Sequence, residues 1–299
     1  MTAATLPWLQ ALLMGLLQGV TELFPVSSLG HAVLFPDIFG WTELAAAQSE
    51  PESYFLAFLV ALHVGTAIGL ITYYFSTWRD LARGLMQQLT RTDVALRQRL
   101  NPSAPDTNPS YRLLFLIVAG TIPVGVVGLL FEHRLRTVFA VPRYSALFLV
   151  INGLVMLTGE ALRRRANRSE EHHELATMSL GSATVVGSSQ IAALFAGVSR
   201  SGVSMVAGLL RGMSHSDAAN FSFLLATPII LAAGLYKLPD FFGPLGDGIR
   251  TQAIVASVVA GVASYLSVKF LSRWFSTHTL WPFGIYCLVV GGYCFFRFG

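Results

Sequence analysis

Six apolar stretches in this sequence are long enough, or nearly so, to cross a lipid bilayer as helices. A helix needs about 20 apolar residues to span the hydrocarbon core. The predicted spans are residues 54–75, 112–131, 144–160, 219–236, 252–272 and 280–298. Hydrophobic residues make up 54% of the chain and charged residues 12%, about half the charged share of an ordinary soluble domain. The sequence therefore predicts an all-α polytopic membrane protein with six transmembrane helices in a single membrane domain, residues 1–299.

Two further apolar stretches, 6–24 and 180–196, run directly into short polar motifs. Each motif is followed by a second apolar piece, which ends at residue 39 in the first case and at residue 213 in the second. A broken helix is tolerated at membrane depth only where protein or a polar cavity surrounds it. We therefore predict two re-entrant helical hairpins, 6–39 and 180–213, in addition to the six spans.

The two hairpin segments resemble each other at a constant offset of 172 residues. The matching positions are Gly15, Gln18, Val26, Ser27 and Gly30, which recur as Gly187, Gln190, Val198, Ser199 and Gly202. The first and fourth predicted spans share a second set of matches, at an offset of 165, and they cross the membrane in opposite directions. Chance similarity among apolar residues is the alternative. The pattern predicts an inverted-topology repeat of residues 1–160 and 180–299, with the hairpin tips meeting near the midplane.

Loop charge predicts the orientation of the spans. Segment 32–53 carries four acidic residues and no Lys or Arg, whereas segment 79–112 carries six arginines. Cytoplasmic loops are enriched in Lys and Arg, so the first segment is expected outside and the second inside. Arg134, Arg136 and Arg143 depart from this rule. The net charge of +4 does not indicate nucleic-acid binding, because the basic residues lie between spans.

The second polar motif has the composition of an anion site. Ser199, Arg200 and Ser201, in a turn that opens a helix, would offer two hydroxyls, a guanidinium and backbone N–H groups to one phosphate. Gly202 would permit close approach of the anion. Alternatively, Arg200 extends to the membrane interface and the serines only cap the helix. An arginine near the midplane is costly without a ligand, which favours phosphate.

The first motif follows a helix with an amide and a carboxylate on one face. Gln18 and Glu22 are four residues apart and therefore neighbours on a helix. Their oxygens could hold a hard divalent cation, Mg²⁺ or Ca²⁺, which would neutralise phosphate charge. The alternative is that Glu22 pairs with Arg200 and no metal binds.

The same motif offers candidate nucleophiles and proton carriers. Ser27, Ser28 and His31 place two hydroxyls and an imidazole within one turn, which suits nucleophilic attack with acid–base assistance. These residues could equally be a helix cap and a packing histidine. His63, alone on a predicted span, is expected to make an interhelical hydrogen bond.

Together these motifs identify a family resemblance. Gln18-x-x-x-Glu22, Phe24-Pro25-Val26-Ser27-Ser28-x-Gly30-His31 and Gly197-x-Ser199-Arg200-Ser201-Gly202 resemble the undecaprenyl-diphosphate phosphatase family, of the bacitracin-resistance type, in the bacterial inner membrane. The resemblance implies a hydrolase that releases phosphate from a polyprenyl diphosphate lipid and regenerates the carrier of cell-wall synthesis. It also implies a divalent metal ion and a site open to the outer face of the membrane.

The resemblance assigns roles to individual residues. The implied catalytic residues are Glu22, Ser27, Ser28, His31 and Arg200. The implied substrate-binding residues are Gln18, Gly30, Ser199, Ser201, Gly202 and Ser204, and the implied metal ligands are Glu22 and Gln18. The chain has Leu29, Ala196 and Ser204 where the family usually has Thr, Pro and Thr. The absence of a hydroxyl at Leu29 would remove one candidate phosphate contact.

A different class of function fits the same features. Inverted repeats with two broken hairpins are also the architecture of transporters, so a transporter or flippase of a polyprenyl phosphate or another anion is the alternative. The expected partners are the lipid substrate and the bilayer, with a homodimer as a further expectation and no nucleic acid.

Overall fold

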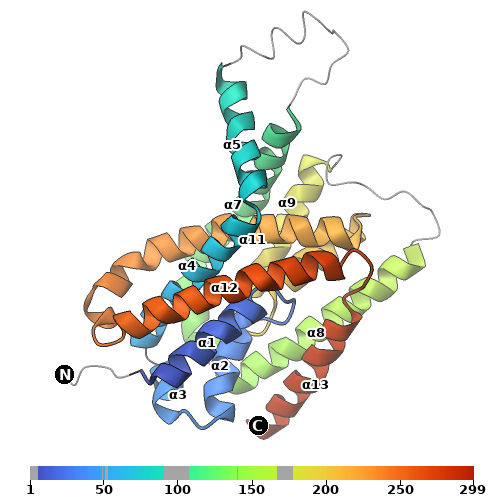
Figure 1. The fold of residues 1–299 in the computed structure, drawn as a ribbon. Helices are drawn as coiled ribbons and strands as arrows, with labels where there is room; N and C mark the ends of the chain where they lie inside the picture. The colour runs from blue at the N-terminus through green and yellow to red at the C-terminus, as the bar shows by residue number, and fades with distance from the viewer. Residues whose placement is uncertain (1–5, 49, 51–52, 91–107, 140, 167–177) are drawn as a thin grey trace, which may run out of the picture.

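The computed structural model describes residues 6–48, 50, 53–90, 108–139, 141–166 and 178–299. Every regular element within those ranges is a helix, which confirms the predicted all-α class. The first half contains α1 (Trp8–Thr21), α2 (Ser28–Ile38), α3 (Thr42–Gln48), α4 (Tyr54–Tyr73), α5 (Phe75–Thr90), α7 (Pro109–Phe139) and α8 (Pro142–Ala166). The second half contains α9 (Leu180–Ser189), η2 (Gln190–Leu194), α10 (Arg200–Leu210), α11 (His215–Phe242), η3 (Pro244–Gly246), α12 (Arg250–Trp274) and α13 (Trp281–Arg297). Figure 1 shows their arrangement.

Five helices of the described ranges are long and apolar enough to cross a membrane: α4, α7, α8, α11 and α12. They coincide with five of the six predicted spans. The sixth, 280–298, forms α13, which has 17 residues and is not among the five. At 1.5 Å per residue such a helix is about 25 Å long, slightly less than a typical hydrocarbon core of about 30 Å.

The predicted hairpins are helix–turn–helix units made of short helices. In the first, α1 of 14 residues is followed by a turn and by α2 of 11 residues. In the second, α9 and η2 precede a turn and α10. A helix of 14 residues is about 21 Å long, too short to cross the hydrocarbon alone. The twofold relation between the two units stays a prediction.

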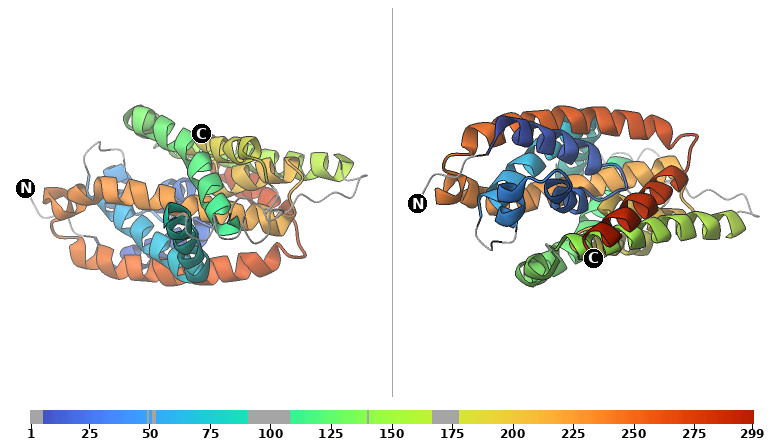
Figure 2. Two further views of the ribbon diagram at one scale, coloured as in Figure 1. Left: turned by 90° about the horizontal axis from the view of Figure 1, so that it is seen from above. Right: turned by 90° about the horizontal axis from the view of Figure 1, so that it is seen from below.

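The hairpins are held between the long helices. Helix α12 packs along α4 and α1, α13 along α8, and α10 against α11 and α8. The view from below shows α1 beside α12 and α13 beside α8 (Figure 2, right). Glycine permits the close approach of α4 to α12, because a Cβ on Gly65 would lie 2.0 Å from the carbonyl oxygen of Ser257.

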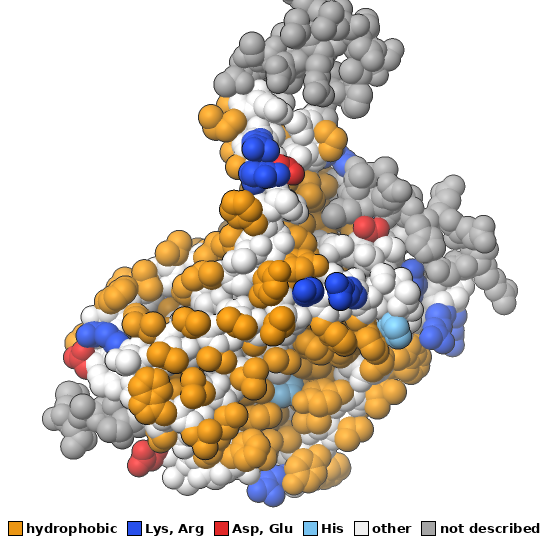
Figure 3. All heavy atoms as spheres, viewed as in Figure 1, with side chains coloured by type: hydrophobic (Ala, Val, Ile, Leu, Met, Phe, Trp, Pro, Cys, Tyr) orange, Lys and Arg blue, Asp and Glu red, His pale blue; other side chains and the backbone are white. Residues whose placement is uncertain are grey.

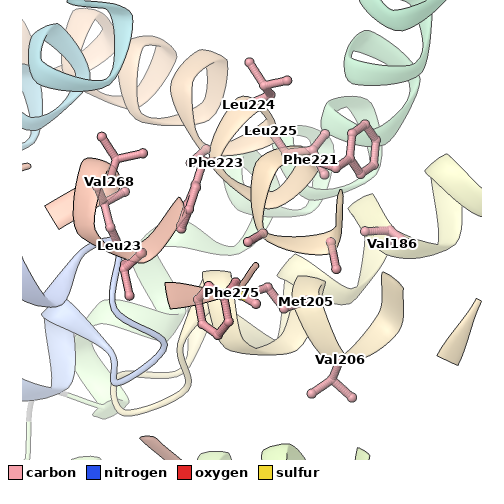
Figure 4. Packing of buried hydrophobic residues seen from close by; sticks show 14 of the residues in the cluster. Leu23, Val186, Met205, Val206, Phe221, Phe223, Leu224, Leu225, Val268 and Phe275 are labelled. Carbon is pink, nitrogen blue, oxygen red and sulfur yellow. The ribbon is translucent and has the colours of Figure 1, made fainter. Parts of the chain in front are cut away.

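Helix α11 forms the centre of the core. Residues 221–227 are all buried, so this part of the helix is covered on every side. Phe221 and Phe223 lie in one cluster with Met205 of α10 and Phe275 at the end of α12 (Figure 4). This cluster gives the second hairpin a rigid support.

The outer surface is apolar over a wide area. Helix α12 exposes Ile254, Val258, Val262 and Leu266, which recur every four residues and are each more than half exposed. Figure 3 shows apolar side chains covering this face, with Lys and Arg toward its margins. Such a surface is that of a helix in contact with lipid, which confirms a multi-pass membrane protein. Residues 91–107 of the basic segment 79–112 lie outside the described residues.

Candidate active site

The turns of the two hairpins meet inside the molecule. A Cβ on Gly30 would lie 2.8 Å from Cα of Gly197, so the two backbones are in direct contact. The hydroxyl oxygen of Ser27 accepts hydrogen bonds from the backbone N–H groups of Gly30 and of Gly197, each at 3.2 Å. The two motifs that the sequence places 170 residues apart are therefore one structural unit.

Both hairpins begin their second helix with the same cap. Ser27 accepts a hydrogen bond from the N–H of Gly30, and Ser199 accepts one from the N–H of Gly202 at 3.2 Å. The capping function, considered above as an alternative for these serines, is thus present in the structure. It leaves the other N–H groups of the helix ends available to an anion.

Asn152 of α8 joins the two turns to each other. Its Nδ2 donates to the carbonyl of Pro25 at 3.0 Å, and its Oδ1 accepts from the N–H of Ser199 at 3.0 Å. The side chain is completely buried. Sequence reasoning assigned Asn152 no role, because a single amide on an apolar helix has no spacing that indicates its partners.

We expect Asn152→Leu to lower the stability of the protein by about 2–5 kcal/mol, because it leaves two buried backbone groups unpaired. The measurement is thermal unfolding of the purified protein in detergent. Thr72→Val is the control, since the hydroxyl of Thr72 only bonds the Ile68 carbonyl in its own helix. An unchanged melting temperature for Asn152→Leu would contradict the bridging function.

Glu22 is the centre of the polar contacts. The residue is 8% exposed, and Arg200 Nη2 forms an ion pair with its Oε1. Its Oε2 accepts hydrogen bonds from Gln18 Nε2 at 3.0 Å and from the hydroxyl of Ser28. His63 Nε2 lies 3.7 Å from the same oxygen. Residues from both hairpins and from α4 therefore converge on one carboxylate.

His63 lies differently from the sequence prediction. Its Nδ1 donates at 2.8 Å to the carbonyl of Leu59, which is in the same helix. Because a carbonyl only accepts, this contact leaves Nε2 to face Glu22. The imidazole thus belongs to the site, whereas we expected it to hold two helices together. A lone histidine in an apolar span carried no indication of this.

A cavity of about 200 Å³ contains this cluster. Its polar lining residues are Glu22, Ser27, Ser28, His63, Gln190, Ser199 and Arg200. Its apolar lining residues include Leu29, Val124, Leu194, Ile229 and Ala233, from both hairpins, α7 and α11. The cavity therefore combines a charged group of residues with apolar walls, which suits a molecule with an anionic head and an apolar tail. Leu29, which takes the place of the family's usual threonine, is one of the apolar lining residues.

Six predicted site residues are not among those that line the cavity: Gln18, Gly30, His31, Ser201, Gly202 and Ser204. Ser201 contacts the hydroxyl of Ser199 at 3.0 Å, and Ser204 contacts that of Ser222 in α11 at 2.7 Å. These contacts hold the turn and its helix in place. His31 is 1% exposed and bonded on both ring nitrogens.

The described residues contain no cluster of three or more His, Cys, Asp or Glu that could enclose a metal ion. The cavity has one carboxylate, Glu22, and Arg200 already pairs with it. Mg²⁺ is commonly bound by one or two carboxylates together with substrate phosphates, whereas Ca²⁺ takes six to eight oxygens. The residues therefore fit a Mg²⁺ ion that is shared with a diphosphate, and fit Ca²⁺ less well.

Comparison with known proteins identifies the family of this chain. Residues 11–293 match the model of the family described as bacitracin resistance protein BacA. The chain is 46% identical to undecaprenyl-diphosphatase 2 of Frankia alni, with 98% of each chain covered. It is 44% identical to undecaprenyl-diphosphatase of Mycolicibacterium paratuberculosis, with 97% of this chain and 96% of the relative covered. It is 41% identical to undecaprenyl-diphosphatase 2 of Chromobacterium violaceum, with 95% and 96% covered. With such matches over nearly its whole length, the chain belongs to the bacitracin resistance protein BacA family.

Proposed function

We propose that this chain is an integral membrane phosphatase that hydrolyses undecaprenyl diphosphate to undecaprenyl phosphate and inorganic phosphate. The observation that carries the proposal is that three polar groups converge in one cavity with apolar walls. They are the guanidinium of Arg200, the carboxylate of Glu22 and the hydroxyl of Ser28. The names of the similar proteins support the same activity. The product would return to cell-wall synthesis as the lipid carrier.

Arg200 is the candidate for the phosphate clamp. Phosphoryl transfer requires stabilisation of charge on the phosphate oxygens more than any other assistance. The Arg200 guanidinium lies at the first residue of α10, where free N–H groups and the helix dipole also favour an anion. An entering diphosphate would exchange with Glu22 as the partner of the guanidinium. Glu22 would then be available to act as a base.

Ser28 is the better placed of the two serine candidates. Its hydroxyl donates to Glu22, so the carboxylate could accept its proton, or that of a water in its place, as the oxygen attacks the terminal phosphorus and the P–O bond to undecaprenyl phosphate breaks. Attack by water would give inorganic phosphate directly, whereas attack by Ser28 would give a phosphoserine that a water then hydrolyses. The Ser27 oxygen instead accepts two backbone hydrogen bonds and caps α2. We therefore assign attack or water activation to Ser28 and a supporting function to Ser27.

A bound Mg²⁺, held by Glu22 and the diphosphate, would add positive charge at the phosphate oxygens. We expect a chelator to reduce phosphate release by at least about tenfold, because this charge would be lost from the transition state. The measurement is turnover of the purified protein with EDTA, followed by addition of Mg²⁺ or Ca²⁺ in excess. Full turnover in EDTA would contradict the metal.

The proposal places the protein in the inner membrane of a bacterium, with the cavity open to the outer face. The basic last turn of α8 and the arginines of α5 support it, because Arg163, Arg164 and Arg165 would then lie in the cytoplasm together with Arg79 and Arg83. A homodimer is part of the proposal and is tested by light scattering in detergent.

The deciding experiment is phosphate release from undecaprenyl diphosphate by purified protein in detergent. A phosphatase releases phosphate under these conditions, because it needs neither a sealed membrane nor a gradient. The Arg200→Ala variant is the control for a contaminating phosphatase. Absence of release, together with movement of the lipid in sealed vesicles, would favour the transporter.

A further inference from the structure

Ser27 has an unusual backbone conformation. Its φ of 71° makes it the one non-glycine residue with positive φ among the residues that the structure describes, and its ψ is 101°. Side-chain-bearing residues rarely occupy this region, and they stay there only when surrounding contacts hold them. The next residue is Ser28, whose hydroxyl donates to Glu22. The direction of the Ser28 side chain therefore depends on what fixes the Ser27 peptide.

His31 holds the carbonyl of Ser27. Its Nδ1 lies 2.8 Å from that oxygen, and its backbone N–H also donates to it at 3.2 Å. Because a carbonyl oxygen only accepts, Nδ1 carries the hydrogen. In the neutral ring Nε2 then accepts, and its partner is the hydroxyl of Tyr286 at 2.8 Å.

Tyr286 of α13 fixes the imidazole in a second way. The two rings are stacked, with centroids 5.7 Å apart and an angle of 10° between the planes. His31 thus has both nitrogens occupied, is 1% exposed, and is not among the residues that line the cavity. Tyr286 is 41% exposed and does not line it either.

From this chain of contacts we propose that His31 and Tyr286 are positioning residues, which hold the strained Ser27 peptide so that the Ser28 hydroxyl meets Glu22. The inference rests on the proposed function for its effect on catalysis. In this arrangement His31 acts as a hydrogen-bond donor through Nδ1 and carries no proton to or from the substrate. Tyr286 acts only through His31.

The test compares two substitutions of His31 that differ in one hydrogen bond. Asparagine places its Nδ2 donor one bond beyond Cγ, as histidine places Nδ1, whereas leucine has the bulk but no donor. We expect His31→Asn to keep turnover within about threefold of wild type and His31→Leu to lower turnover by at least about a hundredfold. Only leucine lacks a donor for the Ser27 carbonyl, so only this variant leaves the Ser27 peptide unheld. Equal inactivity of two folded variants would overturn the proposal, because the imidazole itself would then be required.

A double-mutant cycle tests Tyr286. We expect Tyr286→Phe, which keeps the ring and loses the hydroxyl, to lower kcat by no more than about threefold with KM unchanged. In the His31→Asn background the same substitution should have no further effect, because Nε2 is already absent. An undiminished effect there would overturn the proposal. Tyr293→Phe, on the same helix and 60% exposed, is the control and should match wild type.

Nitrogen NMR of the wild-type protein with labelled histidine tests the arrangement independently of enzyme activity, because it reports which ring nitrogen of His31 carries the hydrogen. The chain has seven histidines, and the His31 signals are those that His31→Asn removes. The proposal requires a neutral ring with hydrogen on Nδ1, and hydrogen on Nε2 would overturn it. If this tautomer is seen but wild-type protein releases no phosphate, the proposed function fails and the Ser27–His31–Tyr286 arrangement stands.

Discussion

Arg200→Lys is expected to lower turnover of undecaprenyl diphosphate by at least about a hundredfold, close to the loss from Arg200→Ala. The planar guanidinium can hold two phosphate oxygens at once, whereas the lysine ammonium is a single compact charge. In the structure Arg200 is the first residue of α10, and its guanidinium reaches across the cavity to Glu22. The helix therefore fixes its backbone, and the ion pair fixes its guanidinium. A lysine that pairs with Glu22 would not present two donors to the diphosphate.

Initial rates of phosphate release over a range of substrate concentration measure this effect. Arg79→Lys is the matched control, because Arg79 lies on α5 and its side chain is 48% exposed. A hundredfold loss corresponds to about 2.7 kcal/mol of transition-state stabilisation. Wild-type turnover and KM for Arg200→Lys would show that residue 200 only balances the charge of Glu22, and the phosphate clamp would have to be abandoned.

Glu22→Gln is expected to reduce turnover by about 10²–10⁴-fold, the range typical of a lost general base. The amide keeps the shape of the side chain but removes the charge that Arg200 pairs with and the basic oxygen that Ser28 contacts. It also removes the one carboxylate that the cavity offers to a metal ion. Thermal unfolding in detergent should show a folded protein, so that the loss can be assigned to chemistry.

One substitution is the control for Glu22→Gln. Glu43→Gln in α3 makes the same chemical change away from the site. Near-full turnover of Glu22→Gln would mean that neither the base nor the metal ligand has been identified.

Most of the fold follows from the order of polar and apolar residues. A bilayer requires about 20 apolar residues per helix, and this rule located α4, α7, α8, α11 and α12 to within a few residues. The same rule located α13, predicted at 280–298 and found at Trp281–Arg297, although this helix has 17 residues and is shorter than the other five. The short helices α1 and α9 were indicated by the polar motifs that follow them in the sequence.

The core of the candidate site was also accessible from the sequence. Glu22, Ser28 and Arg200 are residues that are costly to bury in an apolar setting, and they lie in the two related motifs or, for Glu22, on the helix that precedes the first motif. The chemical types of these side chains were enough to predict a site that binds an anion and contains a general base. The pairing of Glu22 with Arg200 was one of two predicted arrangements, the other being a metal ion on Glu22. It was predicted because a charged side chain at membrane depth is costly unless an opposite charge lies beside it.

The tertiary structure alone decided which polar residues face the cavity and which hold it together. Asn152, His63 and Tyr286 each stand alone on an apolar helix, and their partners at Pro25, Glu22 and His31 come from elsewhere in the chain. A motif reports which groups are close in sequence, but the direction of a side chain depends on the rotation and packing of whole helices. For this reason the sequence by itself determined the membrane helices and the charged residues of the site, and only packing paired Glu22 with Arg200 and placed His63, but not His31, in the lining of the cavity.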